Sequence, residues 1–439
     1  MSSLAEVRLW GATVGAVLLS DGAKAATFEY DSEFASRGIE ISPLAMPLAP
    51  GRIYSFPGLP EKSFRGLPGL LADSLPDLYG NALIEAWLTA RGEETDDFDA
   101  VRRLCYTGKR GMGALEFAPA LGPEPTKSHI LDLEALVDLA AEVLARRADL
   151  ATSLNQPEKR DALREILRVG TSAGGARAKA LIALNPTTNE LRSGQLDTGP
   201  GFEYWILKFD GVEDETRDFG SARGYGVVEW VYSTMAGNAG IEMAECRLLE
   251  EGGRRHFMTR RFDRTTPGDK LHMQSLAALA HLDYNQAGAH SYEQAFRVIR
   301  RLGLPHAAGE QQFRRMVFNV VARNQDDHVK NIAFLMDRAG RWSLSPAFDV
   351  VYAYNPRGRH TSQHQMSVNG KLDGIEVEDL RAVAGFAGLK RGRAEKILAE
   401  VTEAVRAWPR LAAEAGVKED RIDRIAETHR LDLSTEAGS

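Results

Sequence analysis

A short polar stretch from Asn324 to Asn331, NQDDHVKN, concentrates side chains that can carry out chemistry. It holds two carboxylates, an imidazole, an ammonium and several carboxamides, and the apolar run IAFL follows it directly. A further acid, Asp349, stands among apolar and aromatic residues in SPAFDVVYA. A carboxylate at a loop tip can orient an acceptor hydroxyl and take its proton, and Mg²⁺ prefers hard oxygen ligands. This set favours a phosphotransferase, with Asp326 as the base and Asn331 and Asp349 as metal ligands.

The spacing of Asp326 and Asn331 supports this interpretation, because protein kinases use the same D-x-x-x-x-N pattern followed by a metal-binding Asp. Lys330 would neutralise the transferred phosphoryl group. Two features differ from that pattern: no His-Arg pair precedes Asp326, and Phe-Asp-Val stands where Asp-Phe-Gly is usual. The stretch also fits a solvated loop rich in turn-forming residues. Asp327, the neighbour of the proposed base, is expected to be replaceable.

A metal-dependent hydrolase is a third interpretation of the same stretch. Asp326, Asp327 and His328 would supply its oxygen and nitrogen ligands. We see no second His/Asp cluster in the sequence to complete such a site. The hydrolase therefore ranks below the phosphotransferase.

Residues that could bind a nucleotide lie upstream. Lys208 sits inside the apolar strand EYWILKFD, where a lysine rarely stays without a partner, so we expect it to contact phosphates. An edge strand with a lysine facing water is the alternative. Glu229, in the next amphipathic segment, is a candidate ion-pair partner for Lys208. In HFMTRRFDR, Asp263 could hold ribose hydroxyls, and a surface Arg/Asp pairing is the alternative.

The loop TSAGGARAK offers a second contact with phosphates. Its small residues, Gly175 among them, let the backbone approach an anion, and Lys179 adds a positive charge at its end. Ser172 is a hydroxyl within this loop and hence a candidate phosphorylation site. A flexible hairpin or linker loop is the alternative.

The elements that must position these residues follow from the hydrophobic pattern. Alternation in VRLW and TVGAVLL predicts a small antiparallel sheet near the N-terminus. In QFRRMVFNVVAR the apolar residues recur with helical spacing, so a buried helix should deliver NQDDHVKN at its C-terminal end, with IAFL and RWSL forming a hairpin after it. The expected order is a β-rich unit at 1–105, a mixed α and β region at 106–264, and a mostly helical region at 265–439.

Bulk composition limits the class of protein. The chain has 439 residues, 44% hydrophobic and 26% charged, which is typical of a globular protein with two or three structural units. Cys105 and Cys246 lie in no disulfide or metal-binding spacing. The N-terminal residues, with Glu6 and Arg8 before the apolar stretch, argue against a signal peptide, and no apolar run is long enough to span a membrane. We therefore expect a cytoplasmic protein. The net charge of −7 argues against DNA binding by the whole surface.

Taken in order, these segments resemble the HipA family of serine/threonine kinases, the toxin halves of bacterial toxin–antitoxin pairs. The resemblance spans nearly the whole chain. It rests on FRGLPGLLADSLPD, the loop S-x-x-G-x-x-x-K, the strand lysine, the RFDR segment, the D-x-H-x-K-N core and the later F-D. It implies an α+β, two-lobed protein-kinase-like fold with a small β-rich N-terminal subdomain and an all-helical C-terminal lobe.

The resemblance also implies roles for individual residues. Asp326 would be the catalytic aspartate, and Asn331 and Asp349 would bind Mg²⁺. Ser172 matches an inactivating autophosphorylation site, with Thr171 beside it as the alternative hydroxyl. ATP would be bound by residues from both lobes: Ser172, Gly175, Lys179, Lys208, Asp263, His328 and Lys330.

Partners are implied as well. The family pairs its kinase with a small HipB-like helix-turn-helix antitoxin, so contact with DNA would be indirect. Its known substrates are aminoacyl-tRNA synthetases, notably the glutamate enzyme, whose phosphorylation halts translation and favours dormancy. Two other functions remain open. One is a catalytically idle co-repressor, which would have no need of a metal-binding set; the other is a small-molecule kinase, which shares the D-x-x-x-x-N pattern.

Overall fold

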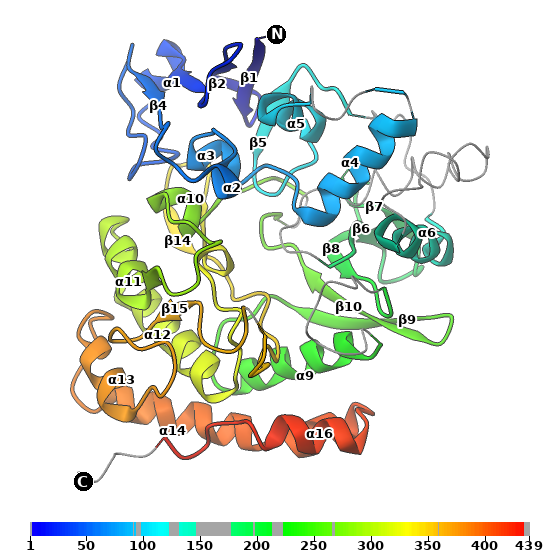
Figure 1. Ribbon diagram of the computed structural model, residues 1–439, viewed down its shortest axis with the longest axis vertical. Coiled ribbons are helices and arrows are strands. Elements are labelled where there is room, and N and C mark those ends of the chain that lie inside the picture. The colour runs from blue at the N-terminus through cyan, green and yellow to red at the C-terminus, as the bar shows by residue number, and fades with distance from the viewer. Residues whose placement is uncertain are drawn as a thin grey trace.

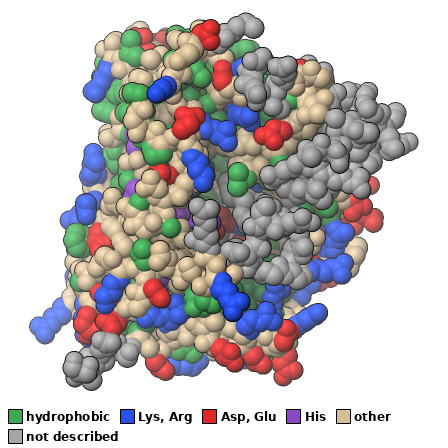
Figure 2. Space-filling model, in the orientation of Figure 1, with side chains coloured by type: hydrophobic (Ala, Val, Ile, Leu, Met, Phe, Trp, Pro, Cys, Tyr) green, Lys and Arg blue, Asp and Glu red, His purple; other side chains and the backbone are tan. Residues whose placement is uncertain are grey.

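The computed structural model describes residues 2–90, 92–93, 98–122, 131–145, 177–195, 198–212, 223–265, 268–358 and 360–433. Figure 1 shows one sheet at the N-terminus, a second sheet beside it, and a largely helical region below both. None of the helices in these ranges combines the length and apolar character needed to cross a membrane. Figure 2 shows acidic and basic side chains interspersed over one face of the molecule.

The N-terminal sheet has five antiparallel strands in the order β4-β3-β2-β1-β5. Buried and exposed residues alternate along most of β1 and β2, as the sequence pattern predicts. The strands are β1 (Ser3–Leu9), β2 (Ala12–Leu19), β3 (Thr27–Tyr30), β4 (Ile53–Ser55) and β5 (Leu115–Ala118). Because β5 pairs with β1, this unit extends beyond the expected boundary at residue 105.

Short helices accompany the first sheet and lead to the second. They are α1 (Ser32–Ser36), α2 (Glu61–Phe64), α3 (Gly69–Ala72), α4 (Leu78–Ala90) and α5 (Ala100–Thr107). Asp99 caps α5 by accepting from the backbone N–H of Arg102. Apolar side chains of α4 share a core with the second sheet rather than with the first.

The second sheet is also antiparallel, with the order β7-β6-β8-β10-β9. Its strands are β6 (Lys179–Leu184), β7 (Leu191–Ser193), β8 (Glu203–Lys208), β9 (Cys246–Glu251) and β10 (Arg254–Arg260). Helices α4 and α6 (Leu133–Ala145) pack their apolar side chains with those of β6 and β8, while α9 (Tyr225–Asn238) contacts β9 and β10. Lys208 therefore lies at the end of a central strand.

The C-terminal region is dominated by helices around a large apolar core. They are α10 (Leu276–Ala280), α11 (Tyr292–Arg301), α12 (His306–Val321), α13 (Val377–Ala384), α14 (Arg393–Arg406), α15 (Trp408–Glu414) and α16 (Glu419–Ala426). Helix α12 is buried along most of its length, and it packs on α11 and α14.

This region is not all-helical, which corrects the expectation from the family resemblance. The strands are β11 (His272–Ser275), β12 (His290–Ser291), β13 (Ala333–Met336), β14 (Trp342–Leu344) and β15 (Met366–Ser367). The β13–β14 hairpin, which the sequence predicts, gains a third strand because β11 pairs with β13. An isolated hairpin is only marginally stable in water, so the added strand stabilises it.

Candidate active site

The polar stretch forms a loop between α12 and β13, as the sequence predicts, and it ends in the 3₁₀ turn η1 (Val329–Asn331). Nδ2 of Asn331 donates to the backbone oxygen of Asp326 at 2.8 Å, which closes the loop and leaves the amide oxygen of Asn331 able to accept or to coordinate. The Asp326 side chain is 48% exposed, and its Oδ1 lies 3.8 Å from Nε2 of His328. A carboxylate this accessible can meet the hydroxyl of a second molecule.

A largely buried group of three charged residues lies beside this loop. Nζ of Lys208 contacts Oε1 of Glu229 at 2.5 Å and also contacts Oδ1 of Asp349. Burial disfavours the charged lysine, but Asp349 and Glu229 outweigh it and raise the pKa of Lys208 above its ordinary value. The expected Lys208–Glu229 pair is therefore confirmed, and Asp349 joins it.

Asp349 is held in an unusual conformation. Its φ is 52°, in the left-handed region that few residues other than glycine adopt. Its side chain is 28% exposed, against 2% for Glu229, so it is the more accessible of the two carboxylates. Burial raises its pKa, yet Lys208 and then Lys179 lower it, and the net shift is downward. Asp349 is thus held ionised, as a metal ligand must be.

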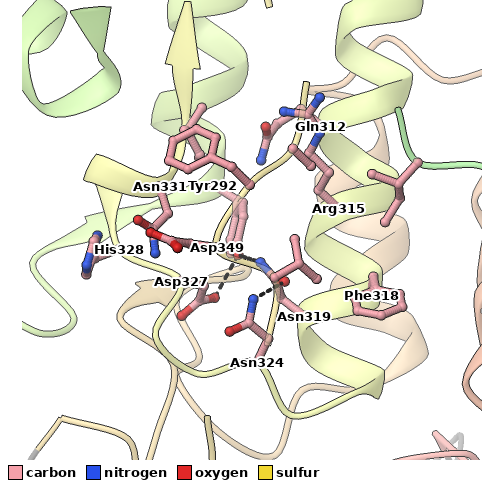
Figure 3. Close-up of a pocket in the computed structure, with 15 residues that line it drawn as sticks. Tyr292, Gln312, Arg315, Phe318, Asn319, Asn324, Asp327, His328, Asn331 and Asp349 are labelled. Carbon is pink, nitrogen blue, oxygen red and sulfur yellow. Dashed lines mark hydrogen bonds between the residues drawn. The ribbon is translucent and has the colours of Figure 1, made fainter. Parts of the chain in front are cut away.

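A small cavity adjoins Asp349. Asn331, Asp349 and His328 line it, and Figure 3 shows these three side chains close together. The cavity volume is about 30 Å³, enough for a water or an ion but not for a nucleotide. One amide oxygen and one carboxylate form the oxygen donor set that suits Mg²⁺. In the part of the chain that the structure describes, no group of three or more His, Cys, Asp or Glu side chains could hold a metal.

Asp327 has a different role from the one expected. It is 4% exposed, and its carboxylate accepts hydrogen bonds from the Tyr292 hydroxyl at 2.7 Å and from the Gln365 backbone N–H at 2.8 Å. Nδ1 of His364 lies 2.8 Å from the same carboxylate. Figure 3 shows the bond to Tyr292 and its continuation through Asn319 to Asn324. A buried acid with these partners supports the loop, so its contacts argue against the expectation that Asp327 is replaceable.

Asp263 is also a buried structural acid. It accepts from Nε of Arg261 at 3.0 Å, from Nη1 of Arg264 at 2.8 Å and from the backbone N–H of Gly113 at 2.7 Å. Burial acts to raise its pKa, but the two arginines lower it far below its ordinary value. Because the side chain is fully buried and bonded, it cannot reach a ribose, and the expected ribose contact is wrong.

Comparison with known proteins places this site in a family. Residues 5–118 match the HipA N-terminal domain, and residues 171–408 match the HipA-like C-terminal domain. The chain belongs to the HipA family. HipA of Shewanella oneidensis MR-1, solved with HipB and its operator DNA, superposes with a TM-score of 0.66 at 19% identity, covering 96% of this chain and 94% of that one. This likeness shows that the two HipA-family chains share a fold.

Two further comparisons cover less. A putative kinase of Haemophilus influenzae is 26% identical over 125 residues, which is 26% of this chain. The HipA-family chain thus covers 36% of the length of that curated relative. The Helicobacter pylori proinflammatory kinase CtkA gives a TM-score of 0.29 at 13% identity, over 51% of this chain and 92% of that one, too low a score to carry any argument.

The loop that carries part of the HipA resemblance is described only at its end. Ser172, with its alternative Thr171, and Gly175 lie outside the described residues. Lys179 is the first residue of β6, and Lys208 is its direct partner in β8. It is buried, with Nζ 2.9 Å from Oδ2 of an acid in the N-terminal unit, Asp77.

Asp77 was missed by the sequence interpretation. It belongs to FRGLPGLLADSLPD, whose two acids stand in a largely apolar stretch, and acids in such surroundings usually need a charged or hydrogen-bonding partner. The remaining loop cation, Lys330, places Nζ 4.7 Å from the centroid of the Tyr284 ring, a cation–π contact.

Proposed function

We propose that this chain is an ATP- and Mg²⁺-dependent serine/threonine-protein kinase, the toxin of a type II toxin–antitoxin pair. The observation that carries the proposal is the charged group Lys208–Glu229–Asp349 beside the loop that holds Asp326 and Asn331. In protein kinases a lysine held by a helix glutamate orients the nucleotide phosphates, next to a metal-binding aspartate. Here too the lysine lies on a strand, β8, and the glutamate on a helix, α9, with an aspartate, Asp349, beside them.

In the proposed mechanism, Asp326 accepts the hydrogen bond of a serine or threonine hydroxyl and takes its proton as the hydroxyl oxygen attacks the terminal phosphorus of ATP. The bond from that phosphorus to the bridging oxygen breaks, and ADP leaves with the bond's electron pair. Lys208 binds a phosphate oxygen, while Glu229 fixes its ammonium. Asn331 and Asp349 would hold Mg²⁺, which supplies neutralisation of phosphate charge when it is bound.

Further contacts with ATP complete the proposal. His328 and Lys330 stand on the same loop as the base and would face the transferred group. Gly175 and Ser172 would contact the phosphates from the other side, while Lys179, buried against Asp77, would add positive charge behind them without touching them. Autophosphorylation at Ser172 would inactivate the kinase by adding charge to a loop that otherwise covers ATP.

The proposed partners follow from family membership. The Shewanella HipA was solved with HipB and operator DNA. We propose that a HipB-like antitoxin likewise binds this chain, with DNA reached only through the antitoxin. The proposed substrate is an aminoacyl-tRNA synthetase, the glutamate enzyme or a relative, in the cytoplasm. Its phosphorylation would inhibit translation and promote growth arrest or persistence.

Phosphate transfer from labelled ATP tests the proposal. Asp326→Asn keeps the shape of the side chain but removes the base, so transfer should fall about 10²- to 10⁴-fold while Mg-ATP binding by calorimetry persists. Asp337→Asn, at an acid in the β13–β14 turn, is the matched control and should keep full transfer. A wild-type protein that binds no Mg-ATP would instead favour the idle co-repressor. Phosphoproteomics after induced expression separates a protein kinase from a small-molecule kinase, because only the former adds phosphate to a protein target.

A further inference from the structure

Two acids of the N-terminal unit contact the residues that support the proposed site on either side, the strand beside Lys208 and the helix beside the loop of Asp326. Asp73 follows α3 and Asp77 precedes α4, in the sequence LADSLPD. Neither acid faces the cavity beside Asp349, whose lining comes from residues after 240. Their contacts instead run to the strand next to Lys208 and to the helix next to the catalytic loop.

Asp77 pairs with Lys179, the lysine that begins strand β6. Its Oδ2 lies 2.9 Å from Nζ of Lys179, and the two side chains are only 6% and 4% exposed. Oδ1 of Asp77 is used as well, since it accepts from the backbone N–H of Gly80 at 2.7 Å and so starts α4. The acid is thereby fixed from both sides.

The position of Lys179 makes this pair important for the site. Lys179 stands directly opposite Lys208 in the neighbouring strand, and its positive charge also acts on Asp349. Like charges at paired strand positions repel. Without Asp77, a buried cation beside Lys208 would compete with it for Asp349.

Asp73 supports the catalytic loop indirectly, through Ser275 and the residue after it. Its two carboxylate oxygens accept from the backbone N–H of Ser275 at 2.6 Å and from the Ser275 hydroxyl at 2.8 Å. Ser275 ends β11 and caps α10. The next residue, Leu276, donates its backbone N–H to the oxygen of Ile332 at 2.7 Å, and Ile332 directly follows the proposed metal ligand Asn331.

We infer that Asp73 and Asp77 form a positioning clamp. Asp77 fixes the position of Lys179, and thereby of Lys208 opposite it, and Asp73 fixes the position of the catalytic loop, residues 324–331, through Ser275. The inference rests on the proposed function, and it assigns to the N-terminal unit a part in catalysis. Both acids are positioning residues, since neither touches the reacting groups. Loss of Asp77 and loss of Asp73 should change different kinetic constants, because Asp77 supports ATP binding and Asp73 supports the base and a metal ligand.

Steady-state phosphate transfer tests this separation. Asp77→Asn should raise the KM for Mg-ATP about 10- to 100-fold, the usual cost of losing a residue that orients a ligand, with a smaller change in kcat. Asp73→Asn should lower kcat by a similar factor and leave the KM for Mg-ATP nearly unchanged. The matched control is Glu116→Gln, which breaks the 2.8 Å pair with Lys270 that also joins the N-terminal sheet to later residues. It should change neither constant.

A double substitution tests the route through Lys179. If Asp77 acts through Lys179, then Asp77→Asn with Lys179→Met should be no worse than Lys179→Met alone. Multiplied effects would overturn this arm. Removing both charges also provides a folded alternative if Asp77→Asn alone leaves an unpaired buried lysine and does not fold, because neutral replacement of a buried pair is well tolerated.

Hydrogen exchange tests the other arm without any activity. Asp73→Asn should speed exchange at the Leu276 amide and in residues 326–332, and Glu116→Gln should not. If wild-type protein transfers phosphate and both clamp variants behave like Glu116→Gln, the clamp is refuted while the kinase stands. If wild-type protein transfers no phosphate, the kinase proposal fails. In that case, unchanged exchange in Asp73→Asn also refutes the clamp. Faster exchange would still support the claim that Asp73 holds the loop in place, without a role in catalysis.

Discussion

Substitution of Asp327 by alanine should unfold the loop that the neighbouring Asp326 needs. The carboxylate accepts from the Tyr292 hydroxyl and the Gln365 backbone, and it also contacts His364. Each buried group left without a partner costs roughly 1–3 kcal/mol. Partial relaxation reduces the sum, so we expect the free energy of unfolding to fall by about 3–5 kcal/mol, at the upper end for a single substitution.

Urea denaturation followed by tryptophan fluorescence measures this loss as a lower midpoint. Asp326→Asn is the matched control, because that side chain is 48% exposed. It should shift the free energy of unfolding by less than about 0.5 kcal/mol while lowering transfer about 10²- to 10⁴-fold. An Asp327→Ala protein with the wild-type midpoint and full activity would refute the structural role of this acid. Loss of activity in Asp327→Ala at an unchanged midpoint, together with an active Asp326→Asn, would exchange the roles of the two acids.

Three other predictions concern residues around the site. Lys208→Met leaves the Glu229 and Asp349 carboxylates without their shared cation, so kcat/KM for ATP should fall about 10²-fold or more, whereas Glu229→Gln, which keeps the Asp349 contact, should lose less. Asn331→Ala should raise the Mg²⁺ concentration needed for half-maximal transfer about tenfold or more, and an unchanged requirement would remove Asn331 from the metal site. The pKa of Asp263 is lowered on folding, so its ionised form stabilises the protein above its ordinary pKa of about 4, and that contribution is lost progressively as the pH falls from there toward the much lower pKa of the folded state. Asp263→Asn should therefore lower the unfolding temperature most at neutral pH and less as the pH falls below about 4, and it should leave the preference for ATP over 2′-deoxy-ATP unchanged.

The sequence could predict what depends on neighbours along the chain. The helix, loop and hairpin around Asp326 follow from the hydrophobic period before it and the apolar run after it. The Lys208–Glu229 pair also follows from local reasoning, because a lysine in an apolar strand needs a partner, and the next helix offers one.

Contacts between distant segments could not be predicted in the same way. Asp263 and the backbone N–H of Gly113 are 150 positions apart, and Asp327 lies 37 positions from His364. An acid beside arginines, or one in a polar loop, looks solvent-exposed in the sequence, and only the packing of remote segments buries it. The added strand β11 in the C-terminal sheet has the same cause, since a short strand is fixed by its partner rather than by its own period.

The core of the N-terminal unit also includes side chains from the β13–β14 hairpin. Met336 is fully buried in that core, and the indole of Trp342 packs against it and donates to the backbone oxygen of Glu40, 302 positions earlier. During synthesis the first sheet therefore leaves the ribosome with part of its apolar surface uncovered, although N-terminal units usually fold first. A fragment that stops before the hairpin would keep that surface exposed to aggregation. The N-terminal unit therefore completes its apolar core only after the β13–β14 hairpin, which follows the catalytic loop in the sequence, has been synthesised.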